Sequence, residues 1–197
     1  MIQIEAGTLF FAAIFTNNIL LTNFLGLCPF LSISREIRSS LGLGIAVVFV
    51  MTCTAAINYL LYYYVLEPLN LDHFKYIVFI IVIAAFVQLV EMAVERFFPA
   101  LYFVLGIFLP LITVNCAILG ASLFLIIRKY TLLQSVVYGA GSGIGWMLAI
   151  IAVGAIREKL QKSAKLPKGL EGPAITLIIT GLMSLAFTAF SGMIQIQ

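Results

Sequence analysis

The stretch NNILLTNFLGLCPF, residues 17–30, places Cys28 between a glycine and a proline inside an uncharged run. A second stretch, LGIFLPLITVNCA, residues 105–117, places Cys116 after Gly106 and a proline. Glycine and proline break or kink helices. Broken backbone is tolerated at membrane depth only where it is buried in protein or lines a cavity, and two such segments in corresponding halves indicate an internal site. We therefore predict two half-helix loops that bring two cysteine thiolates toward one point inside a membrane.

The composition is typical of a membrane protein. Of the 197 residues, 63% are hydrophobic and only 10% are charged, whereas soluble domains carry about 25% charged residues. The basic residues form no patch with interleaved aromatic residues, so nucleic acid is not an expected partner. The N-terminal sequence MIQIEAG has neither a basic region nor a signal-peptidase cleavage site, so we expect no removable signal peptide.

Six uncharged or nearly uncharged runs predict six transmembrane helices, because about 20 apolar residues span a bilayer. The runs are residues 6–34, 39–66, 76–90, 97–127, 130–156 and 172–197. The first and fourth runs would be roughly 44–46 Å long as straight helices, against about 30 Å of hydrocarbon. We therefore predict an all-α membrane protein whose first and fourth helices are broken into half-helices.

The order of the runs predicts a single transmembrane domain, residues 1–197, built from two inverted repeats of three helices. The repeats are about residues 1–96 and 97–197. An overlong run with a cysteine leads each half, and a glycine-rich stretch follows it, which is the pattern of an inverted-topology repeat. The glycines within residues 139–145 predict close helix packing through small residues rather than a phosphate loop, because no strand precedes them and no lysine follows.

The basic residues predict the orientation. Eight lie in loops on one side: Arg35, Arg38, Arg96, Arg157, Lys159, Lys162, Lys165 and Lys168. Three lie on the other side: Lys75, Arg128 and Lys129. The positive-inside rule places the first group in the cytoplasm, so both chain termini are expected outside it.

Cys28 and Cys116 are the candidate metal ligands. A free cysteine is often only a small buried hydrophobic residue, and we expect that role for Cys53, which lies in a run without a break. For the other two cysteines the pattern leaves packing and metal ligation equally open. An iron–sulfur cluster usually takes four cysteines, so a symmetric partner subunit would have to supply two. No Ser–His–Asp set, HExxH or CxxC motif is present, and no catalytic residue is predicted.

Polar groups near the breaks have two possible roles. Asparagines such as Asn18 and Asn115 either bond neighbouring helices or cap the broken helix ends. Backbone N–H groups freed around Gly26 and Asn115 are expected to donate toward sulfur, because in hydrocarbon they must find some acceptor.

Five segments of this chain resemble the membrane subunit shared by two respiratory complexes. They are NNILLTNFLGLCPF, VQLVEM, GIFLPLITVNCAILG, GSGIGWMLAI with AIRE, and GLMSLAFTAFSG. One complex is Rnf, which passes electrons between ferredoxin and NAD, and the segments resemble its A subunit. The other is the sodium-pumping NADH:quinone oxidoreductase, Nqr, whose E subunit is homologous. The resemblance covers about residues 10–193.

The details of the motifs divide between the two complexes. Asn17-Asn18, CPF at 28–30 and EPLN at 67–70 are more similar to the A subunit of Rnf. TVNCAI at 113–118 and the GWMLAI stretch are more similar to the E subunit of Nqr. We predict the A subunit of Rnf as the nearer relative, with the E subunit of Nqr as the alternative.

The resemblance implies a bacterial inner-membrane protein in a six-subunit complex. It implies pairing in lipid with a homologous subunit of opposite topology, which is the E subunit in Rnf and the D subunit in Nqr. Each of the pair contributes two cysteines to a shared intramembrane [2Fe-2S] cluster, and the family positions correspond to Cys28 and Cys116. The cluster relays electrons across the membrane, coupled to Na⁺ or H⁺ translocation. Flavins belong to other subunits, and this subunit in isolation is expected to be inactive.

A small secondary transporter is the competing interpretation of the pattern, since broken helices also bind substrates and ions. The cysteine at each break distinguishes the two, because a carrier site would more naturally show acidic or backbone ligands there.

The orientation can be tested with a reporter that is active only in the cytoplasm. Fused to Gln197, it should give no signal, because the group of eight basic residues holds the opposite side inside. A strong signal from this fusion would overturn both the orientation and the inverted-repeat assignment.

Overall fold

The computed structural model describes residues 5–33, 37–69, 71–97, 109–163 and 173–191. In these ranges all regular secondary structure is helical, which confirms the predicted all-α class. Five residues named above, Arg35, Gly106, Lys165, Lys168 and Gln197, lie outside the described ranges.

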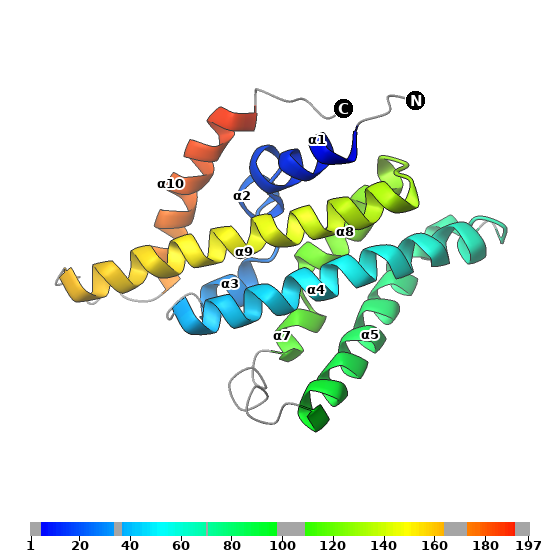
Figure 1. Ribbon diagram of the computed structural model, residues 1–197, viewed down its shortest axis with the longest axis horizontal. Coiled ribbons are helices and arrows are strands. Elements are labelled where there is room, and N and C mark those ends of the chain that lie inside the picture. The colour runs from blue at the N-terminus through cyan, green and yellow to red at the C-terminus, as the bar shows by residue number, and fades with distance from the viewer. Residues whose placement is uncertain (1–4, 34–36, 70, 98–108, 164–172, 192–197) are drawn as a thin grey trace.

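The described helices follow one another in chain order (Figure 1). They are α1 (Ala6–Phe11), the π-helix η1 (Ala12–Thr16), α2 (Ile19–Asn23), α3 (Leu27–Ile33), α4 (Ile37–Leu61), the π-helix η2 (Tyr62–Leu66), the 3₁₀-helix η3 (Asp72–Phe74), α5 (Lys75–Phe97), α7 (Leu109–Thr113), α8 (Cys116–Ile127), α9 (Leu132–Ser163) and α10 (Pro173–Ser191).

Three helical segments are long and apolar enough to cross a membrane: Ser40–Leu66, Lys75–Arg96 and Leu132–Leu160. Three shorter apolar segments complete the set: Ala6–Thr16, Leu111–Ile127 and Pro173–Ala189. Each of the six lies within or over one of the six runs in the sequence. The structure therefore agrees with a multi-pass membrane protein, and a crossing by all six segments stays a prediction.

The first and fourth runs are both interrupted. In the first run, the helix stops at Asn17 and again between Phe24 and Gly26, where both residues adopt positive φ angles of 54° and 84°. A left-handed residue of this kind commonly ends a helix. In the fourth run, α7 ends at Thr113 and α8 begins at Cys116. Neither of these two apolar runs is therefore one straight helix.

Helices α4 and α9 run antiparallel and pack along their length (Figure 1). A methyl group added at Gly143 would lie 2.9 Å from Val48 Cα, and one at Gly139 would lie 2.8 Å from Ala55 Cβ. On another face of α9, a methyl group at Gly145 would lie 3.0 Å from the Ile14 carbonyl oxygen. These glycines allow close approach of two neighbours, as small residues do in membrane helices. The predicted packing role of residues 139–145 is confirmed.

Helices α5 and α10, the last helices of the two halves, each pack against helices of the other half of the chain. α5, from the first half of the chain, packs against α7 and α8 of the second half, while α10, from the second half, packs against η1, α2 and α3 of the first (Figure 1). Each broken segment therefore rests on the last helix of the other half. This exchange is what two inverted repeats would produce, although the repeat itself stays a prediction.

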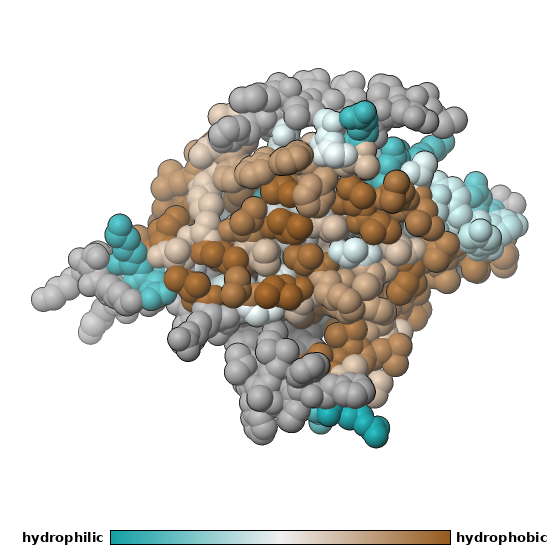
Figure 2. All heavy atoms as spheres, viewed as in Figure 1, coloured by the Kyte–Doolittle hydropathy of each residue, from teal (hydrophilic) through white to brown (hydrophobic). Residues whose placement is uncertain are grey.

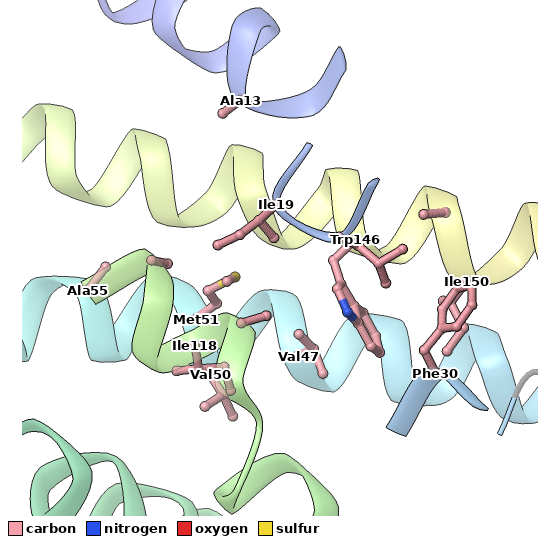
Figure 3. Packing of buried hydrophobic residues seen from close by; sticks show 14 of the residues in the cluster. Ala13, Ile19, Phe30, Val47, Val50, Met51, Ala55, Ile118, Trp146 and Ile150 are labelled. Atoms are coloured by element: carbon pink, nitrogen blue, oxygen red, sulfur yellow. The ribbon is translucent and has the colours of Figure 1, made fainter. Parts of the chain in front are cut away.

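The core lies where α4, α9 and the broken segments meet. Figure 3 shows Trp146 on α9, Val47 on α4 and Phe30 on α3 within one cluster, which also includes Ile19 and Ile118. Apolar side chains also cover much of the outer face, with hydrophilic residues gathered at its margins (Figure 2). Such an outer face suits contact with hydrocarbon or with apolar protein.

The expected loop position of five basic residues was wrong. Arg38 lies at the start of α4, and Arg96 lies in the last turn of α5. Arg157, Lys159 and Lys162 lie within α9, which continues to Ser163, and Arg157 is buried. The reason is that the sequence REKLQKS is rich in strong helix formers, so the helix extends beyond its apolar part. Trp146, the only tryptophan in the sequence, is fully buried in the same helix.

Replacing Gly143 by Ala should weaken the α4–α9 contact. The new methyl group would press on the backbone at Val48, which cannot rotate away, and we expect a loss of about 1–3 kcal/mol. The matched control is Gly181→Ala in α10, where a methyl group meets nothing within 4 Å and helix propensity favours alanine by up to about 1 kcal/mol. Thermal unfolding in detergent measures both; equal melting temperatures would contradict the assigned contact.

Candidate functional site

The two broken segments cross at Gly26. The Gly26 N–H donates a hydrogen bond of 2.9 Å to Cys116 Sγ, although the two residues are 90 positions apart. A methyl group at Gly26 would lie 2.6 Å from Trp146 Nε1 and 3.0 Å from both Asn115 Oδ1 and Ala117 Cβ. With a φ of +84° as well, this position requires glycine. The contact is of the kind predicted between a freed backbone N–H and a cysteine sulfur.

Asn18 organises the first break. Its side-chain oxygen accepts hydrogen bonds from the Leu20 and Leu21 N–H groups, at 3.1 and 3.4 Å, and so caps α2. Its side-chain nitrogen donates to the Ile14 carbonyl at 3.2 Å and to the Gly145 carbonyl of α9 at 2.8 Å. Asn18 therefore both caps a helix end and bonds a neighbouring helix, so the two alternatives left open by the sequence hold together.

Other backbone groups of this break also find partners. The Leu25 N–H donates to the Ile19 carbonyl at 3.3 Å. Ser184 of α10 donates its hydroxyl to the Leu21 carbonyl at 2.7 Å. Buried backbone polar groups are nearly always paired. Ser184 could not be singled out from the sequence, because its hydroxyl is one of several in the last apolar run.

Asn115 plays the corresponding role at the second break. Its side-chain oxygen accepts from the Ala117 N–H at 3.0 Å and caps α8. Its side-chain nitrogen is buried and has no hydrogen-bond partner among the residues that the structure describes, and the same holds for Trp146 Nε1. Of these two donors, Trp146 Nε1 lies against Gly26, while Asn115 meets Gly26 through its side-chain oxygen, so its unpartnered amide nitrogen lies close by.

Cys28 and Cys116 occupy similar places in their segments. Cys116 is the first residue of α8 and is half-buried, while Cys28 is the second residue of α3 and is exposed. Cys28 follows Gly26 by two residues, a separation that the chain bridges with at most about 7 Å. The crossing at Gly26 therefore brings both cysteines to one region of the fold. Cys53 lies within the unbroken helix α4, as expected.

The crossing is open on its outer side. We call Thr22, Asn23, Phe24, Cys28 and Val114 the exposed break surface, since all five lie at or beside the breaks and are exposed. Phe24 is 50% exposed and Val114 is 70% exposed. Irregular backbone cannot face lipid in the hydrocarbon region of a membrane. If the breaks lie at that depth, another protein must cover this surface.

Known proteins of one family are similar to this chain over nearly its whole length. The family described as "Rnf-Nqr subunit, membrane protein" matches residues 6–194. The chain belongs to the Rnf-Nqr family. Within this family, it is 51% identical over 191 residues to the E subunit of the Na(+)-translocating NADH-quinone reductase of Aeromonas hydrophila, covering 94% of this chain and 96% of the relative.

Other Rnf-Nqr relatives carry the same description. The E subunit of the Serratia proteamaculans reductase is 52% identical over 191 residues, and that of Psychromonas ingrahamii is 47% identical over 195 residues. In both comparisons the match covers 94% of this chain and 96% of the relative.

The predicted identity as the A subunit of Rnf was therefore wrong, because these relatives are E subunits of the Na⁺-translocating NADH-quinone reductase. The structure explains why one of the signals misled. Asn18, part of the pair that favoured Rnf, is a helix cap that the fold itself requires. The segments that favoured Nqr contain Asn115, Cys116 and Trp146, which lie at the crossing.

Asn18→Ala should destabilise the protein, because it removes the cap of α2 and both donors to backbone carbonyls. We expect a loss of about 2 kcal/mol, the upper end for a helix cap. The matched control is Asn17→Ala, since the neighbouring half-buried side chain makes no hydrogen bond to any residue that the structure describes. Thermal melting of the detergent-solubilised protein compares them, and an equal loss in both variants would refute the bridging role.

Proposed function

We propose that this chain acts as the E subunit of a Na⁺-translocating NADH:quinone oxidoreductase in a bacterial inner membrane. In this proposal Cys28 and Cys116 supply two of the four thiolates of an intramembrane [2Fe-2S] cluster. A homologous subunit of opposite topology supplies the other two, and the remaining subunits carry the flavins. The observation that carries the proposal is the crossing of the two cysteine-bearing breaks at Gly26.

The residues at the crossing fit such a cluster. Thiolates are the usual ligands of iron–sulfur clusters, and hydrogen bonds to their sulfurs are a main control of potential. The Gly26 N–H already bonds the Cys116 sulfur, and the Asn115 amide leaves a buried donor nearby. A site with surplus N–H donors suits a sulfur-rich group that carries negative charge. Cys116 also begins a twelve-residue helix, whose N-terminus favours negative charge.

The ligand count and the exposed break surface both support a partner subunit. Among the described residues, no three His, Cys, Asp or Glu side chains gather into a metal site. A four-thiolate site would therefore take ligands from another chain. Cys28 lies on the exposed break surface, so a partner that covers this surface would also bring its own cysteines close. The exchanged packing of α5 and α10 supports an inverted repeat in a single transmembrane domain.

The cluster, when bound, would accept and release one electron at a time between carriers on opposite sides of the membrane. The residues of this chain would contribute by holding the cysteine ligands in position. The breaks bring Cys28 and Cys116 to one region, Asn18 and Asn115 hold the helix ends, and the packed core of α4 and α9 keeps water away from the inner side. The relatives' names support coupling of this electron flow to Na⁺ translocation.

A cation carrier without a metal cluster is less well supported by the same site. Na⁺ binds oxygen ligands, and the side-chain oxygens of Asn18 and Asn115 are already occupied by the N–H groups that they cap. Two groups at the crossing have no partner within the described part of the chain, the Asn115 amide and the Trp146 indole, and both are donors. Surplus donors suit an anionic group and not a cation.

Single Cys28→Ala and Cys116→Ala changes should each abolish the cluster and the electron flow that depends on it. The matched control is Cys53→Ala, which removes a thiol from an unbroken helix and should cost only packing, on the order of 1 kcal/mol. The measurement is the [2Fe-2S] electron paramagnetic resonance signal and iron content of the purified complex, together with Na⁺ uptake into vesicles.

Retention of the cluster signal and of Na⁺ uptake in Cys28→Ala or Cys116→Ala would refute the assignment of that residue. Loss of iron in an assembled Cys53→Ala complex would show that the ligand pair was wrongly chosen. A wild-type complex that is intact but free of iron at this site would favour the carrier instead.

A further inference from the structure

We propose that Trp146 is a positioning residue whose indole N–H raises the reduction potential of the metal cluster held by Cys116. This inference rests on the proposed function, and it assigns a role to a side chain outside the ligand set. It joins three observations: the burial of Trp146, its N–H without an acceptor in the described part of the chain, and its contact with the residue that bonds the sulfur.

Trp146 is fully buried in the middle of α9 and is the only tryptophan of the chain. Its Nε1 has no hydrogen-bond partner among the described residues. Buried indole N–H groups usually have a partner, and a buried polar group left without one costs about 1–3 kcal/mol. A phenylalanine would fill most of the same space without that cost, so packing alone does not explain the choice of tryptophan here.

The indole nitrogen lies close to the position that a Cβ atom of residue 26 would take. A methyl group at Gly26 would lie 2.6 Å from Trp146 Nε1, so the indole packs closely against the Gly26 backbone. The N–H of the same glycine bonds Cys116 Sγ at 2.9 Å. Trp146 therefore packs against the glycine that donates to the sulfur, which places its unpartnered indole N–H close to the existing donor of that sulfur.

The direction of the effect follows from charge. A cluster gains one negative charge when it is reduced, and N–H dipoles that point toward it favour the reduced state. The dipole of Trp146 acts strongly here because its surroundings are a cluster of buried apolar side chains, which lowers the local dielectric constant. Removal of the Trp146 N–H should therefore lower the potential while both cysteine ligands stay in place.

The test is a redox titration of the cluster in the purified complex, followed by its electron paramagnetic resonance signal. Trp146→Phe removes the N–H and keeps an aromatic ring. Replacement of Trp146 by 3-benzothienylalanine removes only the N–H, because sulfur takes the place of nitrogen in a ring system of nearly the same shape. We expect both to shift the reduction equilibrium about tenfold toward the oxidised state, which is about 59 mV for a one-electron couple.

Tyr138→Phe is the matched control, since it removes a polar group from a buried aromatic residue about two turns earlier on α9 and should leave the potential unchanged. An unchanged potential in the benzothienylalanine protein would overturn the inference while the proposed function stands, and this variant also decides the case if Trp146→Phe loses the cluster. A wild-type complex without any [2Fe-2S] signal would instead overturn the proposed function and the inference with it.

Discussion

A backbone N–H that leaves a helix inside an apolar protein must find an acceptor, and at Gly26 that acceptor is a cysteine sulfur. This hydrogen bond sets two further requirements at the crossing. Position 26 must be glycine, because the backbone is left-handed and because Trp146, Asn115 and Ala117 leave no room for a Cβ atom. The two breaks must also lie at one place, since the donor belongs to the first and the sulfur to the second.

The helix pairs around the crossing hold it in position. Gly139 and Gly143 let α4 approach α9, while Gly145 lets the first break approach α9 on another face. The Gly145 carbonyl then accepts from Asn18, whose oxygen starts α2. The next residue along α9 is Trp146, whose indole packs against Gly26. One short stretch of α9 thus supports both the first break and the donor to the sulfur, and small residues make this double contact possible.

The features that could be predicted from the sequence are those that depend on residues close together in the chain. Overlong apolar runs with glycine and proline predicted the breaks, and the spacing of glycines predicted close packing on α9. The partners across the fold could not be predicted, because Asn18 bonds a carbonyl 127 positions away and Gly26 bonds a sulfur 90 positions away. Arg157 was wrongly placed in a loop because the end of the apolar run was taken as the end of the helix, although the strong helix formers that follow it continue α9. The choice between two related complexes was also wrong, because it relied on short segments, whereas the similarity to the Nqr E subunits extends over 191 residues.

Two features at the crossing lack a partner within the described part of this chain, and they lie in the same region of the fold. If the breaks lie within the hydrocarbon layer, the exposed break surface needs a cover that lipid cannot provide. On the inner side of the same crossing, the Asn115 and Trp146 donors have no acceptor within the described part of the chain. A partner subunit would complete the first feature, and a sulfur-ligated anionic group would complete the second. A cluster held between two such subunits meets both needs at once, because it takes ligands from each chain and lies where the breaks open toward the partner. Under the proposed function, this one chain would therefore supply half of the site.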